Sequence, residues 1–89
     1  MFAAMPRSVF SPPYIQLIET LVDARHAAGL RQVELADRLG RPQSFVSKVE
    51  RGERRLDAVE FLIFARALGA DGLVILAGVA AKLPRDAAI

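Results

Sequence analysis

Four glycines, each placed just after a run of residues with helical spacing, most constrain how this chain can fold. Gly29, Gly40, Gly52 and Gly69 stand where the apolar positions of the preceding segment stop recurring every three or four residues. Glycine often ends helices because it adopts the left-handed backbone conformation at little cost. No segment alternates apolar and polar residues in the manner of a strand. The sequence therefore predicts an all-α fold built from short helices.

The predicted helices form one compact domain, because a chain of 89 residues has no room for a second. We expect a flexible N-terminal arm over residues 1–10, the folded domain over residues 11–83 and a C-terminal tail over residues 84–89. Five helices are expected, over about residues 12–28, 31–39, 42–51, 57–68 and 71–82.

Two of the expected helix starts carry capping signals. Ser11 can cap the first helix, because the proline after it occupies a position whose backbone N–H would have no partner. Phe10 and Ile15 are spaced for a hydrophobic staple across this cap. Asp57 and Glu60 have the spacing of a capping box at the start of the fourth helix.

Composition excludes several kinds of site. The chain has no cysteine, and its one histidine, His26, has no candidate metal ligands near it in the sequence, so we expect no metal and no cofactor. The apolar run Leu73–Ala81 falls well short of the roughly 20 residues that cross a bilayer. The N-terminus lacks the apolar segment of a signal peptide. These features predict a cytoplasmic protein with no membrane partner.

Positive charge is concentrated between residues 31 and 55. This segment holds seven basic and four acidic residues, a net charge of +3, whereas the rest of the chain has a net charge of −1. A basic patch on a nearly neutral body suits a polyanionic partner such as nucleic acid. A solvated face of ordinary helices would give the same excess, so charge alone does not decide the partner.

The segment Gln32–Val49 has the pattern of a helix-turn-helix. Two helices too short to be stable alone flank Gly40, which follows the small residue Ala36 by four positions. Alanine lets the second helix approach closely, and glycine suits the tight turn. The apolar contacts between the two helices are expected from Leu35, Leu39, Val46 and Val49.

The chain resembles the Xre-type helix-turn-helix family, which has the lambda-repressor-like fold of phage repressors and Cro proteins. The resemblance runs from about Tyr14 to Leu76, and its most specific parts are GLRQVELA at 29–36 and QSFVSKVERG at 43–52. It implies a compact five-helix, lambda-repressor-like domain that docks its third helix into the major groove. It also implies a small transcriptional regulator, with repression as the expected activity and a double-stranded DNA operator as the partner.

The resemblance assigns roles to polar and basic residues around the motif. The start of the third helix is expected to face base edges, where a glutamine amide can pair with adenine through two hydrogen bonds. The base-facing residues are Gln43, Ser44, Ser47 and Lys48. The start of the second helix, the turn and the segment after the third helix are expected to hold phosphates. The phosphate-facing residues are Gln32, Arg41, Arg51, Arg54 and Arg55.

Two positions depart from the family pattern. Phe45 replaces a small polar residue, and its ring either touches a thymine methyl group or folds back onto the domain. Pro42 stands where a serine or threonine cap is usual, so the third helix loses its side-chain cap.

Arg25 falls on the apolar stripe of the first helix, where a charge is costly unless it is paired. In the family, the matching arginine forms a buried pair with a glutamate at the end of the third helix, which is Glu50 here. We therefore expect a structural ion pair that organises the fold and affects DNA only indirectly.

The last two helices carry more apolar residues than a small monomer can bury. The fourth helix has one stripe with Phe61 and Phe64 and a second with Val59 and Ile63. The fifth helix adds further apolar residues, namely Leu73, Val74, Leu76 and Val79. The surplus favours a homodimer, with core packing alone as the alternative.

Three classes of function follow from these observations. The leading one is a dimeric DNA-binding regulator, within which a phage-type repressor, a restriction-modification controller and an antitoxin component are not separable. The second is a protein-interaction module that keeps the fold without binding DNA, with a partner that the sequence does not identify. An enzyme is disfavoured, because no nucleophilic triad, paired-carboxylate cleft or phosphate-binding glycine loop is present.

Overall fold

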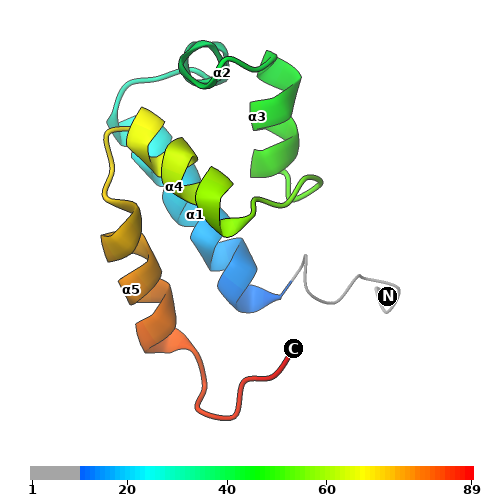
Figure 1. Ribbon diagram of the computed structural model, residues 1–89, viewed down its shortest axis with the longest axis vertical. Helices are drawn as coiled ribbons and strands as arrows, with labels where there is room; N and C mark the ends of the chain where they lie inside the picture. The colour runs from blue at the N-terminus through cyan, green and yellow to red at the C-terminus, as the bar shows by residue number, and fades with distance from the viewer. Residues whose placement is uncertain (1–10) are drawn as a thin grey trace.

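The computed structural model describes residues 11–89, and this range contains five α-helices and no strand (Figure 1). They are α1 (Pro12–Ala27), α2 (Gln32–Leu39), α3 (Gln43–Glu50), α4 (Ala58–Ala67) and α5 (Gly72–Lys82). The predicted all-α fold is confirmed. The expected N-terminal arm, including Phe10 of the predicted staple, lies outside the described residues. Residues 83–89 follow α5 without forming a helix.

The turn between α2 and α3 depends on the backbone conformation of Gly40. This glycine has φ 68° and ψ 31°, in the left-handed region, and its N–H donates to carbonyls in the last turn of α2. A residue with a β-carbon rarely adopts this conformation. Glycine at position 40 therefore lets the chain leave α2 and enter α3 within three residues.

The caps predicted from the sequence are present. The Ser11 hydroxyl accepts a hydrogen bond from the Tyr14 N–H at 3.4 Å at the start of α1. At the start of α4, the Asp57 carboxylate accepts from the Glu60 N–H at 2.7 Å. The Glu60 carboxylate accepts in return from the Asp57 N–H at 3.0 Å, which completes the capping box.

Two further carboxylates start helices where the sequence analysis assigned none. Glu34 accepts a hydrogen bond from the Arg31 N–H at 2.8 Å at the start of α2. Asp71 accepts from the Leu73 N–H at 2.9 Å at the start of α5. By contrast, α3 begins after Pro42, which has no side chain that can accept a hydrogen bond. The first turn of α3 therefore has no side-chain cap, and its first backbone N–H groups remain open to an outside acceptor.

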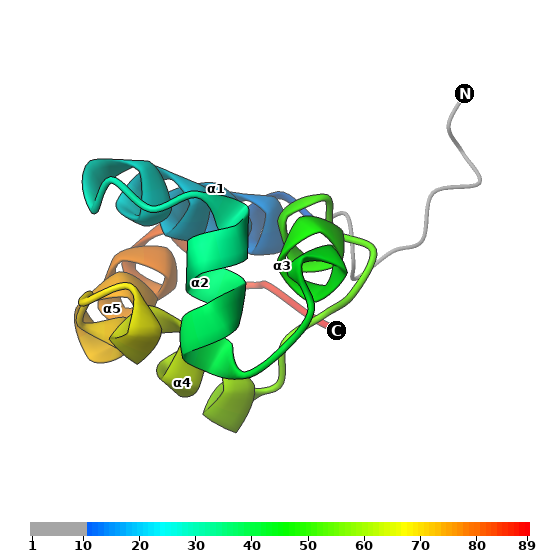
Figure 2. The same ribbon diagram turned by 90° about the horizontal axis from the view of Figure 1, so that it is seen from above.

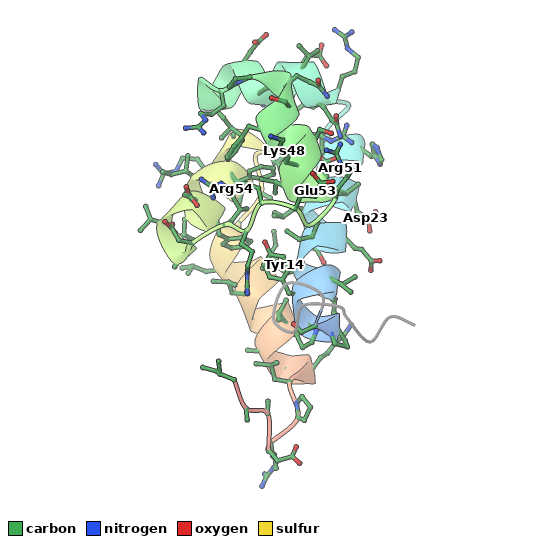
Figure 3. All side chains as sticks on the ribbon, turned by 90° about the vertical axis from the view of Figure 1, so that its right-hand side faces the viewer. Tyr14, Asp23, Lys48, Arg51, Glu53 and Arg54 are labelled. Atoms are coloured by element: carbon green, nitrogen blue, oxygen red, sulfur yellow. The ribbon has the colours of Figure 1, made fainter. Side chains whose placement is uncertain are left out.

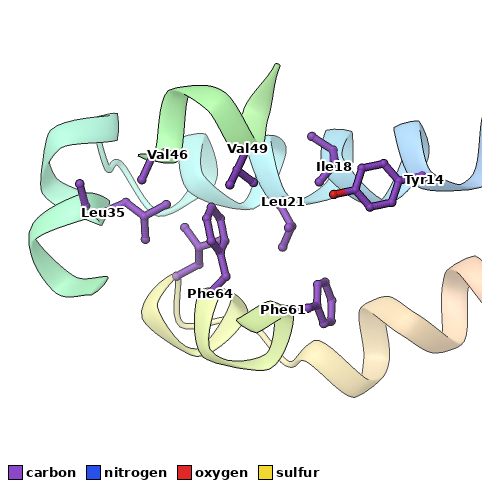
Figure 4. Close-up of a cluster of buried hydrophobic side chains, with 10 residues drawn as sticks. Tyr14, Ile18, Leu21, Leu35, Val46, Val49, Phe61 and Phe64 are labelled. Carbon is purple, nitrogen blue, oxygen red and sulfur yellow. The ribbon is translucent and has the colours of Figure 1, made fainter. Parts of the chain in front are cut away.

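The core lies between α1 and the pair α2–α3 on one side and α4 on the other, as the side chains in Figure 4 show. Its largest fully buried side chains are Phe64, Leu21, Leu35, Val46 and Val49. Burial of each such side chain contributes about 1.5–3 kcal/mol, so these contacts fix the two short helices of the motif on the rest of the domain. Ala36 is 1% exposed, in keeping with a close approach between α2 and α3.

The two helices of the motif and the last helix lie toward opposite ends of the molecule. The helices α2 and α3 lie side by side at one end, as seen from above in Figure 2. Helix α5 lies toward the other end, packed against α1 and α4 (Figure 1).

Within residues 11–89, no helix combines the length and hydropathy needed to cross a bilayer.

Candidate nucleic-acid interface

A buried ion pair joins the end of α3 to α1. The Arg25 Nε donates to Glu50 Oε2 at 2.6 Å, and its Nη2 donates to Glu50 Oε1 at 3.0 Å. Both side chains are 9% exposed. The remaining guanidinium nitrogen of Arg25 donates to the carbonyl of Leu30 at 2.8 Å, in the turn before α2. This arginine therefore connects α1, the loop before α2 and the last residue of α3.

A chain of amide hydrogen bonds extends this pair to the start of α3. Gln32 Nε2 donates to Glu50 Oε1 at 2.8 Å, and Gln43 Nε2 donates to Gln32 Oε1 at 2.6 Å. The orientation of the Gln43 amide is thereby fixed through Gln32 by a buried charge. The Gln43 carbonyl oxygen and the second hydrogen of its Nε2 stay available, and these are the two groups that pair with adenine in the major groove.

The other residues expected to face bases lie on the first two turns of α3. Ser44 and Lys48 are exposed, and neither makes a side-chain hydrogen bond within residues 11–89. Figure 3 shows Lys48 on α3 beside Arg51. Ser47 is half-buried, and its hydroxyl accepts a hydrogen bond from Arg51 Nη1. Ser47 therefore orients an arginine expected to hold phosphate, in addition to lying next to the expected base contacts.

The arginines expected to hold phosphates each have a partner inside the domain. Arg51 forms two hydrogen bonds with the Glu53 carboxylate, at 2.8 and 3.2 Å. Arg54 forms two with the Glu60 carboxylate, at 2.7 and 2.8 Å. Figure 3 places Arg51, Glu53 and Arg54 together on the face formed by the end of α3 and the loop after it.

Two further arginines lie over aromatic rings. The Arg55 guanidinium lies 4.5 Å from the centre of the Tyr14 ring, and the Arg41 guanidinium lies 4.6 Å from that of Phe45. Arg54 covers the Phe45 ring as well, at 5.2 Å. Phe45 is partly buried against the hydrophobic core. Of the two positions considered for this ring, the structure has it folded back onto the domain between two cations.

Hydrogen bonds keep the carboxylates of these pairs ionised. The bond from Arg54, followed by that from the Asp57 N–H, lowers the pKa of Glu60 to about 2. The bond from Arg51 also holds the pKa of Glu53 below its ordinary value. The pKa values of Arg51 and Arg54 are raised by the same pairs. Both ion pairs are therefore fully charged throughout the physiological pH range.

Sequence reasoning had not connected Glu53 or Glu60 with this face. Glu60 was expected only as part of the α4 capping box, and it serves Arg54 as well. A signal was available for Glu53, which stands among the arginines of Glu50–Arg55 and pairs with Arg51, but Glu60 lies outside this segment.

Comparison with known proteins identifies the family. A family model described as a helix-turn-helix domain matches residues 10–75. A solved structure, an XRE-family like protein from Pseudomonas syringae pv. tomato str. DC3000, is 53% identical in sequence, with a TM-score of 0.78. The match covers 81% of this chain and 88% of that one. The chain belongs to the Xre family of helix-turn-helix proteins. No curated protein sequence matches it.

Membership confirms the resemblance drawn from GLRQVELA and QSFVSKVERG, and it gives this Xre-family domain the fold of DNA-binding regulators. Within that fold, α2 and α3 are the two helices of the motif. The polar start of α3 and the arginines expected to hold phosphates therefore lie on this motif or in the loop that follows it.

Proposed function

We propose that this Xre-family protein binds double-stranded DNA sequence-specifically, with α3 in the major groove, and acts as a transcriptional repressor. A bound domain would exclude other proteins from the operator, which is sufficient for repression. The residues involved bind rather than react, so the proposal includes no catalytic step and no cofactor. An operator as the partner implies action in the cytoplasm, as the composition predicts.

The observation that carries this proposal is the fixed Gln43 amide at the start of α3. Its bond to Gln32, which is in turn bonded to Glu50, holds it in one orientation before any ligand is present. A surface glutamine usually gains nothing from such support, whereas a residue that reads a base edge loses less conformational entropy when it is held in place. The exposed Ser44 and Lys48 lie on the same short helix and complete a polar reading surface.

The basic residues around this surface are proposed to hold the DNA backbone. Arg41 precedes α3, and Arg51, Arg54 and Arg55 follow it, so that cations flank the reading surface on both sides. Gln32 at the start of α2 completes the set. Phosphate contacts of this kind fix the register of a protein on DNA and supply affinity that does not depend on sequence.

We further propose that the protein is a homodimer joined through α4 and α5. Helix α5 has one charged residue, Lys82, and its one buried residue is Gly72. Leu73 and Val74 are 69% and 66% exposed, and Val59 on α4 is 66% exposed. An apolar surface of this kind marks an interface. Because it carries almost no charge, two copies can meet on it without like-charge repulsion, as a twofold interface requires.

The experiment that tests the proposed function is binding selection from random DNA duplexes with the purified full-length chain. We expect an enriched pseudo-palindrome whose half-sites lie about one helical turn, roughly 34 Å, apart, since a twofold dimer presents two copies of α3. Enrichment of a single, non-repeated half-site would reject the proposed dimer, whereas the proposal of sequence-specific DNA binding would stand. No enrichment over the starting pool would reject sequence-specific binding and favour a protein-interaction module.

A further inference from the structure

The carboxylates of Glu53 and Glu60 bind two arginines that the proposed function assigns to DNA phosphates. Each carboxylate accepts two hydrogen bonds from the guanidinium group of an arginine at the proposed interface. A carboxylate and a phosphate present the same pair of anionic oxygens to the arginine fork. An arginine so occupied can hold a phosphate only after it releases its carboxylate, or by sharing its remaining N–H groups between the two.

We propose that Glu53 and Glu60 compete with DNA phosphates for Arg51 and Arg54, and that this competition sets the affinity of the domain for DNA of any sequence. This inference rests on the proposed function. It assigns to these two glutamates the role of affinity-determining residues, which act on DNA through Arg51 and Arg54 without touching it.

The surroundings of Arg54 support competition rather than a purely structural pair. Its side chain is 36% exposed, so DNA can reach it, as is also true of Arg51 at 54%. A surface cavity of about 250 Å³ lies beside it and is lined by three cations, Arg41, Lys48 and Arg54, together with Ser44 and Phe45. The single carboxylate of Glu60 leaves this surface net positive, as a phosphate-binding surface requires.

The pairs respond to anions rather than to protons. Because the hydrogen bond from Arg54 lowers the pKa of Glu60 to about 2, this carboxylate does not release the arginine by protonation near neutral pH. Only another anion, or a high concentration of salt, can displace it. The competition is therefore expected to be the same at pH 6 and pH 8.

The substitution Glu60→Gln removes the negative charge at this position and keeps the cap at the start of α4. Glutamine at this position can still accept the Asp57 N–H in the capping box, so α4 keeps its start. The negative charge opposite Arg54 is lost, together with the second oxygen that accepts from Arg54 Nη2. Glu53→Gln removes the charge opposite Arg51 in the same way, and the Glu53 side chain takes part in no helix cap.

The test measures affinities of the full-length protein for a selected duplex and for a random one at several salt concentrations. For Glu60→Gln we expect both affinities to rise roughly 3- to 10-fold near 0.1 M salt, with the salt slope steeper by about one unit. The ratio of the two affinities should stay unchanged. The double variant with Glu53→Gln should add a second increment of similar size.

Two controls make the result specific. Asp86→Asn changes the net charge equally but belongs to residues 83–89, the segment after α5 that Figure 1 shows away from α3, and is expected to change affinity less than twofold. In an Arg54→Gln background, Glu60→Gln should lose its effect, because the arginine through which it acts is gone.

The outcomes are distinguishable. If the unmodified protein binds DNA and Glu60→Gln leaves affinity and salt slope unchanged, or acts equally in the Arg54→Gln background, competition is rejected while the proposed function stands. If the unmodified protein binds neither duplex at any salt concentration, both are rejected.

Discussion

Replacement of Glu50 by alanine is expected to destabilise the domain by about 3–5 kcal/mol, because it leaves the buried Arg25 guanidinium without its counter-charge. Both side chains of this pair are 9% exposed, so solvent screens the stranded charge poorly. The loss also removes the acceptor of Gln32, and with it the support of Gln43. Unfolding in urea, followed by circular dichroism, measures the change in the free energy of unfolding.

Glu19→Ala is the matched control for this substitution. It removes the same side chain from an exposed position on α1, and we expect a change within about 0.5 kcal/mol. Glu50→Gln provides a second, milder variant, which keeps an acceptor for Gln32 and removes the charge together with one of the two acceptors for Arg25. A loss for Glu50→Ala no larger than that of Glu19→Ala would contradict the structural role given to the pair.

Introduction of a charge into the exposed face of α5 is expected to abolish the dimer. Val74→Asp places a carboxylate on a side chain that is 66% exposed in the single chain and buried in the proposed interface. Folding should not suffer, because an acidic residue in the first turn of a helix interacts favourably with its dipole. Since the two half-sites are then bound independently, operator affinity should fall by about 100-fold or more.

Sedimentation and DNA binding test this expectation together. The unmodified protein should sediment as a dimer at tens of micromolar, and Val74→Asp as a monomer. Ile89→Asp, which adds the same charge at an exposed apolar residue of the C-terminal segment, should leave the dimer intact. An unmodified protein that remains monomeric at this concentration, with and without operator, would contradict the dimer.

The fold could be predicted largely because its information is local. Several helix ends are marked by a residue whose chemistry acts within one turn, such as Gly40 in the left-handed region or Asp57 in its capping box. The split of α4 into two faces also followed from spacing: Phe61 and Phe64 are buried, whereas Val59 is exposed. In each case a few neighbouring residues are sufficient to specify the conformation.

The site was less predictable, because its contacts depend on the path of the chain between helices and not on spacing alone. Arg54 and Glu60 are six residues apart, on either side of the start of α4, and no helical spacing in the sequence brings their side chains together. Similarly, Gln32 was expected to hold a phosphate, whereas in the domain its amide also links Glu50 to Gln43. Residue type indicated which side chains could bind DNA, but the geometry shows which of them already have partners.

The assignment of base contacts to α3 and of phosphate contacts to the residues around it is tested most directly by comparing Gln43→Ala with Arg51→Ala. Affinities are measured on a selected and on a random duplex at several salt concentrations. For Gln43→Ala we expect a loss of about 1–3 kcal/mol on the selected duplex, with weaker preference at one base position and little change on the random one. For Arg51→Ala we expect the affinities for both duplexes to fall alike, with a salt slope reduced by about one unit.

An equal loss of affinity for both duplexes in Gln43→Ala, together with an altered base preference in Arg51→Ala, would invert the assignment. Unchanged binding in both variants would contradict DNA recognition through α3.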